Sequence, residues 1–290
     1  MSGGGPVPAP KRAATILSAR DLDAPVALSF ARGTVLAFTM RGPGKEANDD
    51  AAAVLPVGDG AGVLAVADGL GGHAQGARAS EILVGALAEA VARCDGEPSG
   101  LRESVLDGVE RAHREILALG TGAGTTLAAA IVHAGALRPL HAGDSAVIVV
   151  GQRGRIRLET LLHSPTGYAV EAGYLEAHDA LDHEERHLVS NYVGYEGMHL
   201  QIGSLVELAR RDSVLVASDG LLDNLRMAEI ATCIRKGDPA KAAERLRALA
   251  ARRMAGGEEG APCKPDDLTF LLFRPTPPAG WKPPEPAPPS

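Results

Sequence analysis

The sequence predicts an α+β fold in which a sandwich of β-sheets is covered by helices. Short apolar runs typical of strands follow one another across short turns, and helical periodicity is confined to two separate blocks. The regular strand–helix alternation of a parallel sheet is absent. With 290 residues and 45% hydrophobic content, the chain has enough apolar material for a large core.

The first half of the chain begins with strands and continues with a helix pair. Apolar runs predict strands over 33–41, 51–57 and 62–68, and the last of these ends on an acid. Apolar residues spaced three and four apart predict helices over 74–93 and 101–119. We expect these two helices to cover one face of the sandwich.

The second half repeats this order, with strands before helices. After a glycine-rich turn, strands are predicted over 125–133, 137–144, 146–150 and 154–160. Residues 162–200 look irregular and hold all four tyrosines. A strand at 212–220, helices at 227–236 and 239–254, and a closing strand at 267–273 complete the prediction.

Composition divides the chain into an ordered middle and two disordered ends. We expect disorder over 1–26 and in a proline-rich tail over 275–290, with the ordered domain at 27–274. The tail is either inert or a ligand for a proline-binding partner.

Charge and cysteine content narrow the function classes. The net charge of −7 argues against a nucleic-acid-binding surface. Three scattered cysteines form no CxxC pair, so neither a thiolate metal site nor a disulfide framework is indicated. No apolar stretch is long enough for a membrane span, and no signal core follows the first basic residues. We therefore expect a cytoplasmic protein.

Acidic residues recur where the predicted strands end. Carboxylates are rarely buried unless they are paired or bind metal, and hard oxygen ligands favour Mg²⁺ or Mn²⁺ over Zn²⁺. The alternative is that each acid is a separate turn or cap residue. The acids in question are Asp49, Asp50, Asp68, Asp144, Asp219, Asp223, Asp266 and Asp267.

The order of short motifs resembles the bacterial metal-dependent protein phosphatases, the PPM or type 2C family. The motifs are N-D-D, "DGLGGH", "GTT", "AGDS", "ASDGLLDNL" and "PDDLT", and they extend from about residue 34 to 273. The resemblance implies a four-layer α-β-β-α sandwich of two antiparallel sheets flanked by helices. It also implies a flap insertion at about 162–200.

The resemblance implies a role for each motif residue. Asp68 would bridge two Mn²⁺ or Mg²⁺ ions, the carbonyl of Gly69 would bind one of them, and Asp219 and Asp266 would complete the second position. Asp144 with Asp219 would hold a third, weaker ion. Outer-shell waters would be held by Asp50 and Asp49, while Thr125 and Thr126 would form a structural turn.

The implied activity is that of a serine/threonine protein phosphatase. A hydroxide bridging the two ions would attack the phosphorus of a phosphomonoester directly. Phosphorylated proteins would be the substrates, a cognate Ser/Thr kinase the opposing partner, and the enzyme a monomer.

Some positions depart from the family pattern. Lys45 stands where the family has an arginine that contacts the substrate phosphate, and lysine lacks the bidentate fork. Arg41 is a second candidate for that contact. Asp49 replaces a glutamate, Asp267 replaces an asparagine, and Ala146 replaces the arginine of "GDSR". These changes motivate the alternative of a catalytically weak pseudophosphatase that binds phosphoproteins or acts as a regulatory module.

Two histidine features remain open on sequence alone. His73 either holds its own loop by hydrogen bonding or takes part in catalysis. The segment His183–His187, "HEERH", fits the zinc-protease pattern and could place both histidines on one helix face. Its polar surroundings favour a solvated flap segment over a zinc protease or an accidental zinc site. The flap is either a substrate-selecting surface or a small local core.

Overall fold

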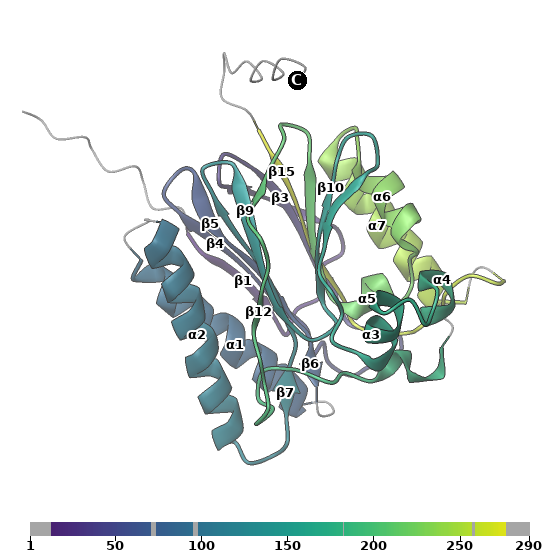
Figure 1. Cartoon of the computed structure of the whole chain (residues 1–290), viewed down its shortest axis with the longest axis horizontal. Helices are drawn as coiled ribbons and strands as arrows, with labels where there is room; N and C mark the ends of the chain where they lie inside the picture. Colours follow the sequence, from purple (N-terminus) through teal and green to yellow (C-terminus); the bar gives the residue numbers. More distant parts are fainter. Residues whose placement is uncertain (1–12, 71–73, 95–97, 182, 257–258, 277–290) are drawn as a thin grey trace, which may run out of the picture.

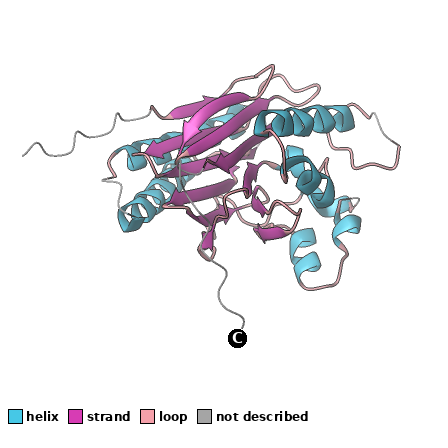
Figure 2. Ribbon diagram, turned by 90° about the horizontal axis from the view of Figure 1, so that it is seen from above, coloured by secondary structure: helices cyan, strands magenta, loops and turns pink. Residues whose placement is uncertain are grey.

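The computed structural model describes residues 13–70, 74–94, 98–181, 183–256 and 259–276. Within them, two antiparallel sheets face each other and helices cover both outer faces, which confirms the predicted sandwich (Figures 1 and 2). Helices α1 and α2 lie against one sheet, and α6 and α7 lie against the other (Figure 1). Of the disordered ends predicted from composition, residues 1–12 and 277–290 lie outside the described residues.

The first sheet has seven strands in the described part of the chain. Its hydrogen-bonded order is β1-β4-β5-β8-β9-β12, and β13 also pairs with β9. The strands are β1 (Thr15–Ser18), β4 (Ala51–Val57), β5 (Ala61–Ala67), β8 (Leu127–His133), β9 (Ala136–Ala142), β12 (Gln201–Ile202) and β13 (Val206–Glu207).

The second sheet has the order β11-β10-β14-β15-β3-β2. Its strands are β2 (Val26–Phe30), β3 (Gly33–Met40), β10 (Ala146–Val150), β11 (Ile156–Glu159), β14 (Ser213–Ala217) and β15 (Leu268–Pro275). A separate two-stranded sheet joins β6 (Gly69–Leu70) to β7 (Gly124–Thr125).

The helices of the outer layers are close to the predicted ranges. The described helices are α1 (Ala74–Ala92), α2 (Pro98–Ala118), α3 (Pro165–Glu171), α4 (Ala177–Ala180), the 3₁₀ helix η1 (Glu184–His187), α5 (Asp219–Leu222), α6 (Met227–Ile234) and α7 (Pro239–Met254). Asp238 caps α7, since its carboxylate accepts from the amide of Ala240 at 2.9 Å.

The central strands are apolar on both faces because each face meets a different layer. In β5, Val63 and Ala65 pack toward α1 and α2, whereas Leu64 and Val66 pack toward the second sheet. Side chains alternate between the faces of a strand, so a continuous apolar run is the expected pattern for a strand buried on both sides.

Ordered structure begins earlier and ends later than predicted. β1 lies before residue 27 and pairs with β4, with Thr15 opposite Val54, so the predicted boundary at 26 is wrong. β15 continues to Pro275, into the predicted tail, because it pairs with β3 along its whole length. β1 is a short edge strand, and only its partner makes it recognisable.

The predicted flap contains more structure than its sequence indicated. Residues 162–200, expected to be irregular, include α3, α4 and η1. Ser164 caps α3 by accepting a hydrogen bond from the amide of Gly167 at 3.0 Å, and Pro165 occupies the first helical position. These helices are too short to show an apolar period.

Candidate metal centre

In the first sheet, acidic residues gather at one end because its strands alternate in direction. Asp50 directly precedes β4, and Asp68 directly follows β5. Ala51 and Ala67 are register partners, so the start of one strand lies beside the end of the next. The antiparallel pairing therefore brings these two acids to the same end of the sandwich.

The second sheet adds its acids to the same cluster. Asp144 precedes β10, Asp219 follows β14, and Asp266 precedes β15. Ala217, at the end of β14, pairs with Ala146 on one side and Phe270 on the other. The carboxylates of Asp50, Asp144, Asp219 and Asp266 all lie within electrostatic range of Asp68, so the five acids form one cluster.

Burial and mutual repulsion make the negatively charged form of these carboxylates unfavourable. Burial, and then the charges of neighbouring acids, raise the pKa of Asp68 and of Asp144 well above the usual range. The pKa of Asp50 is raised by burial and by the charge of Asp267. Converging carboxylates of this kind are stabilised by a cation placed between them.

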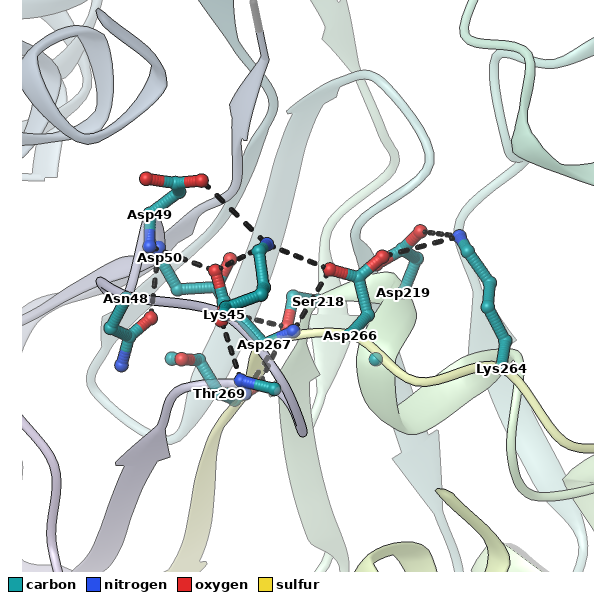
Figure 3. Close-up of polar contacts among 12 residues, drawn as sticks. Lys45, Asn48, Asp49, Asp50, Ser218, Asp219, Lys264, Asp266, Asp267 and Thr269 are labelled. Carbon is teal, nitrogen blue, oxygen red and sulfur yellow. Dashed lines mark hydrogen bonds and ion pairs between the residues drawn. The ribbon is translucent and has the colours of Figure 1, made fainter. Parts of the chain in front are cut away.

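The donor set fits a hard divalent cation. Asp50 Oδ1, Asp144 Oδ1 and Asp219 Oδ1 are buried, and none has a hydrogen-bond partner among the described residues. In the described part of the chain, no three His, Cys, Asp or Glu side chains already form a metal-binding group. Instead, two lysine ammonium groups contact the cluster (Figure 3). A bound ion would supply the missing partners of the buried oxygens.

Lys264 is the residue that sequence reasoning missed. Its ammonium contacts Asp219 and is 3.5 Å from Asp266 Oδ2 (Figure 3). It also lies 2.8 Å from Asp223 Oδ2. Burial alone would raise the pKa of Asp219, but Lys264 outweighs it and lowers that pKa. The sequence signal was that Lys264 lies two residues before Asp266. Lysines are usually solvated, so this spacing alone did not predict a contact with the cluster.

Lys45 lies at the other side of the cluster and is bound to acids. Its ammonium is 2.7 Å from Asp267 Oδ2, 3.0 Å from Asp266 Oδ1 and 3.6 Å from Asp49 Oδ2. Burial would lower its pKa, but the hydrogen bond to Asp267 and the nearby charges raise it instead. The side chain remains 29% exposed, so it lies at the edge of the cluster rather than beneath it.

Asp267 fixes the loop that carries Lys45 and the N-D-D motif. One carboxylate oxygen accepts from the amide of Gly42 at 2.7 Å, and the other accepts from the amide of Asp49 at 2.8 Å as well as from Lys45. Asp267 is 2% exposed. It therefore acts as an acceptor for three donors from one loop.

Thr125 and Thr126 hold the backbone of Asp68, which gives their predicted structural role a physical basis. The carbonyl of Asp68 accepts from Thr126 N at 2.8 Å and Thr125 Oγ1 at 2.9 Å. Thr126 Oγ1 accepts from the amide of Asp68 and lies 2.7 Å from Ser145 Oγ. The "GTT" turn thus links Asp68 to the loop of Asp144.

Gly69 is required for close packing. A Cβ at this position would lie 2.3 Å from the carbonyl carbon and oxygen of Gly76 in α1 and 2.7 Å from the carbonyl oxygen of Asp49. No other residue fits without moving backbone. Its predicted carbonyl contact with a metal ion stays a prediction.

A cavity of about 770 Å³ lies between the flap and the second sheet's helices. Val170 and Leu181 of the flap line it together with Met227 of α6. Asp144 and Asp219 also line it, so the cavity is continuous with the acidic cluster. The site therefore has a partly apolar chamber beside its charged groups.

Stacked histidines connect the flap to the site. The rings of His141 and His163 are stacked with their centroids 4.5 Å apart. The backbone of His163 donates to the carbonyl of Gly143, and its Nδ1 accepts from the amide of Gly143 at 3.2 Å. Asn191 lies 2.7 Å from the same Nδ1. His163 thereby ties the start of the flap to the turn beside Asp144.

The other sequence candidates lie apart from the cluster or outside the described residues. The "HEERH" segment is a 3₁₀ helix starting at Glu184, and His183 caps it by accepting from the amide of Glu185 at 3.1 Å. The two histidines therefore do not share one helix face, and both are exposed, in agreement with the solvated flap segment that the sequence favoured. Arg41 is exposed and pairs with Asp21 at 3.1 Å. His73 lies outside the described residues.

Comparison with known proteins supports the family that the order of the motifs indicates. Residues 43–253 match the family model described as "Protein phosphatase 2C". The serine/threonine protein phosphatase PstP of Mycobacterium tuberculosis is 30% identical over 243 residues, which are 80% of this chain and 43% of PstP. The chain therefore spans less than half the length of that relative.

Solved structures match over most of the chain. The S. agalactiae serine/threonine phosphatase has a TM-score of 0.72 and 29% identity, covering 83% of this chain and 98% of that one. The catalytic domain of PstP in complex with two manganese ions has a TM-score of 0.66 and 26% identity, covering 83% and 96%. With the family model matching more than half of its length, the chain belongs to the protein phosphatase 2C family.

Proposed function

We propose that this chain is a Mn²⁺- or Mg²⁺-dependent serine/threonine protein phosphatase that hydrolyses phosphomonoesters. The observation that carries the proposal is the convergence of five acids from two sheets, with buried carboxylate oxygens that lack partners among the described residues. When bound, two divalent ions would supply an activated water nucleophile and offset charge on the phosphoryl oxygens.

The chain's own residues divide the work between holding ions and orienting water. Asp68, Asp219 and Asp266, with the carbonyl of Gly69, are the proposed ligands of the two ions. Asp50 and Asp49 would hydrogen-bond water around them. The predicted third position, at Asp144 and Asp219, is the one beside which Lys264 lies.

Lys45 is the proposed phosphate-binding residue. Its exposed fraction and its place at the rim of the acids leave the ammonium within reach of an anion at the cluster. Lysine offers a point charge where arginine would offer two parallel donors. Lys45→Arg should therefore lower KM for a phosphopeptide, and an unchanged KM would remove phosphate contact from the role of Lys45.

The biological setting rests on the family resemblance. Phosphorylated proteins as substrates, an opposing Ser/Thr kinase, a monomeric state, a signalling role and a cytoplasmic location stay predictions. So does His73 as a participant in catalysis. In the described residues, no helix combines the length and apolar character needed to cross a membrane.

The second candidate is a catalytically weak pseudophosphatase that binds phosphoproteins or regulates a partner. The observation that favours it is the contact of two lysine ammonium groups with the acids proposed as ligands. If these ion pairs persisted in the presence of added metal, the carboxylates would stay bound to lysine instead of to divalent ions. The chain would then bind its partner without hydrolysing phosphate. Metal-dependent activity separates the two candidates.

The test is hydrolysis of p-nitrophenyl phosphate and of a phosphothreonine peptide with Mn²⁺, with Mg²⁺ or with EDTA. We expect turnover with metal, none with EDTA, and a loss of at least about 100-fold in Asp68→Asn and Asp219→Asn. Asp107→Asn, an exposed change on α2, is the matched control and should keep full activity. Wild-type protein without metal-dependent turnover would favour the pseudophosphatase. Equal turnover in the site variants would refute the site assignment.

A further inference from the structure

Lys264 is held in place by its backbone as well as by its charge. Its amide donates to Asn224 Oδ1 at 2.9 Å, and its carbonyl accepts from Asn224 Nδ2 at 2.8 Å. Asn224 is fully buried and also donates to the carbonyl of Gly220 at 2.9 Å. The buried side-chain amide of Asn224 therefore fixes the backbone of Lys264, whereas a surface lysine has no such anchor.

The ammonium of Lys264 lies where three carboxylates meet. Asp219 and Asp223 lie at the two ends of α5, and Asp266 lies two residues before β15. The side chain of Lys264 is 18% exposed, and those of Asp219 and Asp223 are 12% and 13% exposed. Water screens such groups weakly, so the Lys264 ammonium is the main counter-ion of Asp219 and Asp223.

Carboxylate oxygens without hydrogen-bond partners lie near Lys264 and indicate that a cation fits there. Asp144 Oδ1 and Asp219 Oδ1 are buried without hydrogen-bond partners in the described structure, and Asp144 is 5% exposed. Asp144 also lies within electrostatic range of Asp219, Asp223 and Lys264. Without Lys264, Asp144, Asp219 and Asp223 would offer oxygen ligands to a divalent ion.

We propose that Lys264 is a tethered cation that takes the place of an additional divalent ion at the Asp144–Asp219–Asp223 end of the cluster. The chain then holds divalent ions only at the Asp68 end, and removal of the Lys264 charge opens one further site. A covalently attached ammonium has a high effective concentration and competes strongly with free metal. The inference rests on the proposed metal-dependent function, because it concerns how many ions that site holds.

The test counts metal directly and does not depend on activity. Wild-type protein, Lys264→Met and Lys264→Arg are dialysed to equilibrium against saturating Mn²⁺, and bound manganese is measured per chain. We expect Lys264→Met to bind one more ion than wild type, and Lys264→Arg, which keeps the charge, to bind the same number. Lys241→Met, an exposed lysine on α7, should also leave the number unchanged.

A double variant identifies the extra site. Lys264→Met with Asp223→Asn should return to the wild-type number, because the new site loses a ligand. Circular dichroism confirms that each variant is folded, and Lys264→Gln replaces Lys264→Met if the latter fails to fold. An extra ion that persists in the double variant would overturn the assignment to Asp223.

The outcomes separate this inference from the proposed function. Equal metal content in wild type and in the folded charge-removing variant overturns the role of Lys264 and leaves the phosphatase proposal intact. Wild-type protein that binds no manganese at saturating concentration overturns both. The tethered cation is supported if wild type and Lys264→Arg bind equal numbers of ions and the charge-removing variant binds one more.

Discussion

At the scale of single residues, the site combines its acids with two lysines, Lys45 and Lys264. Lys45 and Asp267 stand where the family resemblance implies arginine and asparagine, and they are bonded to each other at 2.7 Å. The extra negative charge of Asp267 is thus balanced by the ammonium group of Lys45. The two departures are best explained as one pair.

We expect Asp267→Asn to lower the free energy of unfolding by about 1–3 kcal/mol. An amide group can offer only one acceptor atom, so either the amide of Gly42 or that of Asp49 loses its partner. Urea unfolding of the metal-free protein measures the change. In a double-mutant cycle with Lys45→Met, a coupling energy near zero would contradict the pairing.

At the scale of elements, the flap is attached to the site by its first residues and encloses a cavity with α6. His163 connects the flap to the turn before Asp144, and the flap helices α3 and α4 contribute Val170 and Ala180 to the cavity wall. A chamber beside the proposed metal ligands is the expected place for a substrate side chain next to the phosphorylated residue. This observation favours a substrate-selecting flap over a purely local core.

Filling the cavity should discriminate between large and small substrates. We expect Val170→Trp to raise KM for a phosphothreonine peptide several-fold, because the indole occupies space that the peptide needs. Hydrolysis of p-nitrophenyl phosphate should keep its kcat/KM. Tyr174→Trp is the control, since Tyr174 belongs to the same flap but is 89% exposed. A parallel loss with both substrates would show damage to the metal site instead.

At the scale of the whole molecule, three apolar layers bind the two sheets and the helices into one cooperative unit. One layer lies between α1, α2 and the first sheet, one between the sheets, and one between the second sheet and α5–α7. A buried titratable group in any layer therefore affects global unfolding. His141 near the end of β9 is a buried titratable group at the cavity wall, 2% exposed and with Nδ1 unpartnered in the described structure.

We expect acid to destabilise the fold partly through His141. Burial, and then the nearby His163, lower the pKa of His141 from 6.5 to about 4. The unfolded chain therefore binds the proton first, so the contribution is complete above pH 6.5 and is lost as the pH falls from 6.5 towards 4. The loss amounts to about 3 kcal/mol at most.

The measurement compares urea unfolding of wild type and His141→Gln across this pH range. The stability difference between the two proteins should shrink on acidification, because glutamine does not titrate. A constant difference between wild type and His141→Gln would refute the assigned titration.

Sequence reasoning predicted most strands, the long helices and every acid of the cluster, because these depend on local patterns. It missed β1, β2, β12, β13, the flap helices α3 and α4, and the contacts of Lys264. A four-residue edge strand such as β1 has no period of its own and exists through pairing with β4. The "HEERH" spacing suggested a shared helix face, whereas His183 is a cap in the structure.

The amino-acid sequence was sufficient to predict the fold class and the family and to propose which carboxylates hold metal, because apolar runs, strand-end acids and the order of short motifs are visible residue by residue. The balance of charges, in contrast, became visible only in three dimensions. Lys45 and Lys264 are far from most of their partners along the chain, and pairing of the strands brings them to opposite sides of one cluster (Figure 3). Electrostatic energy depends on distance in space and on burial, and neither can be read from spacing along the chain.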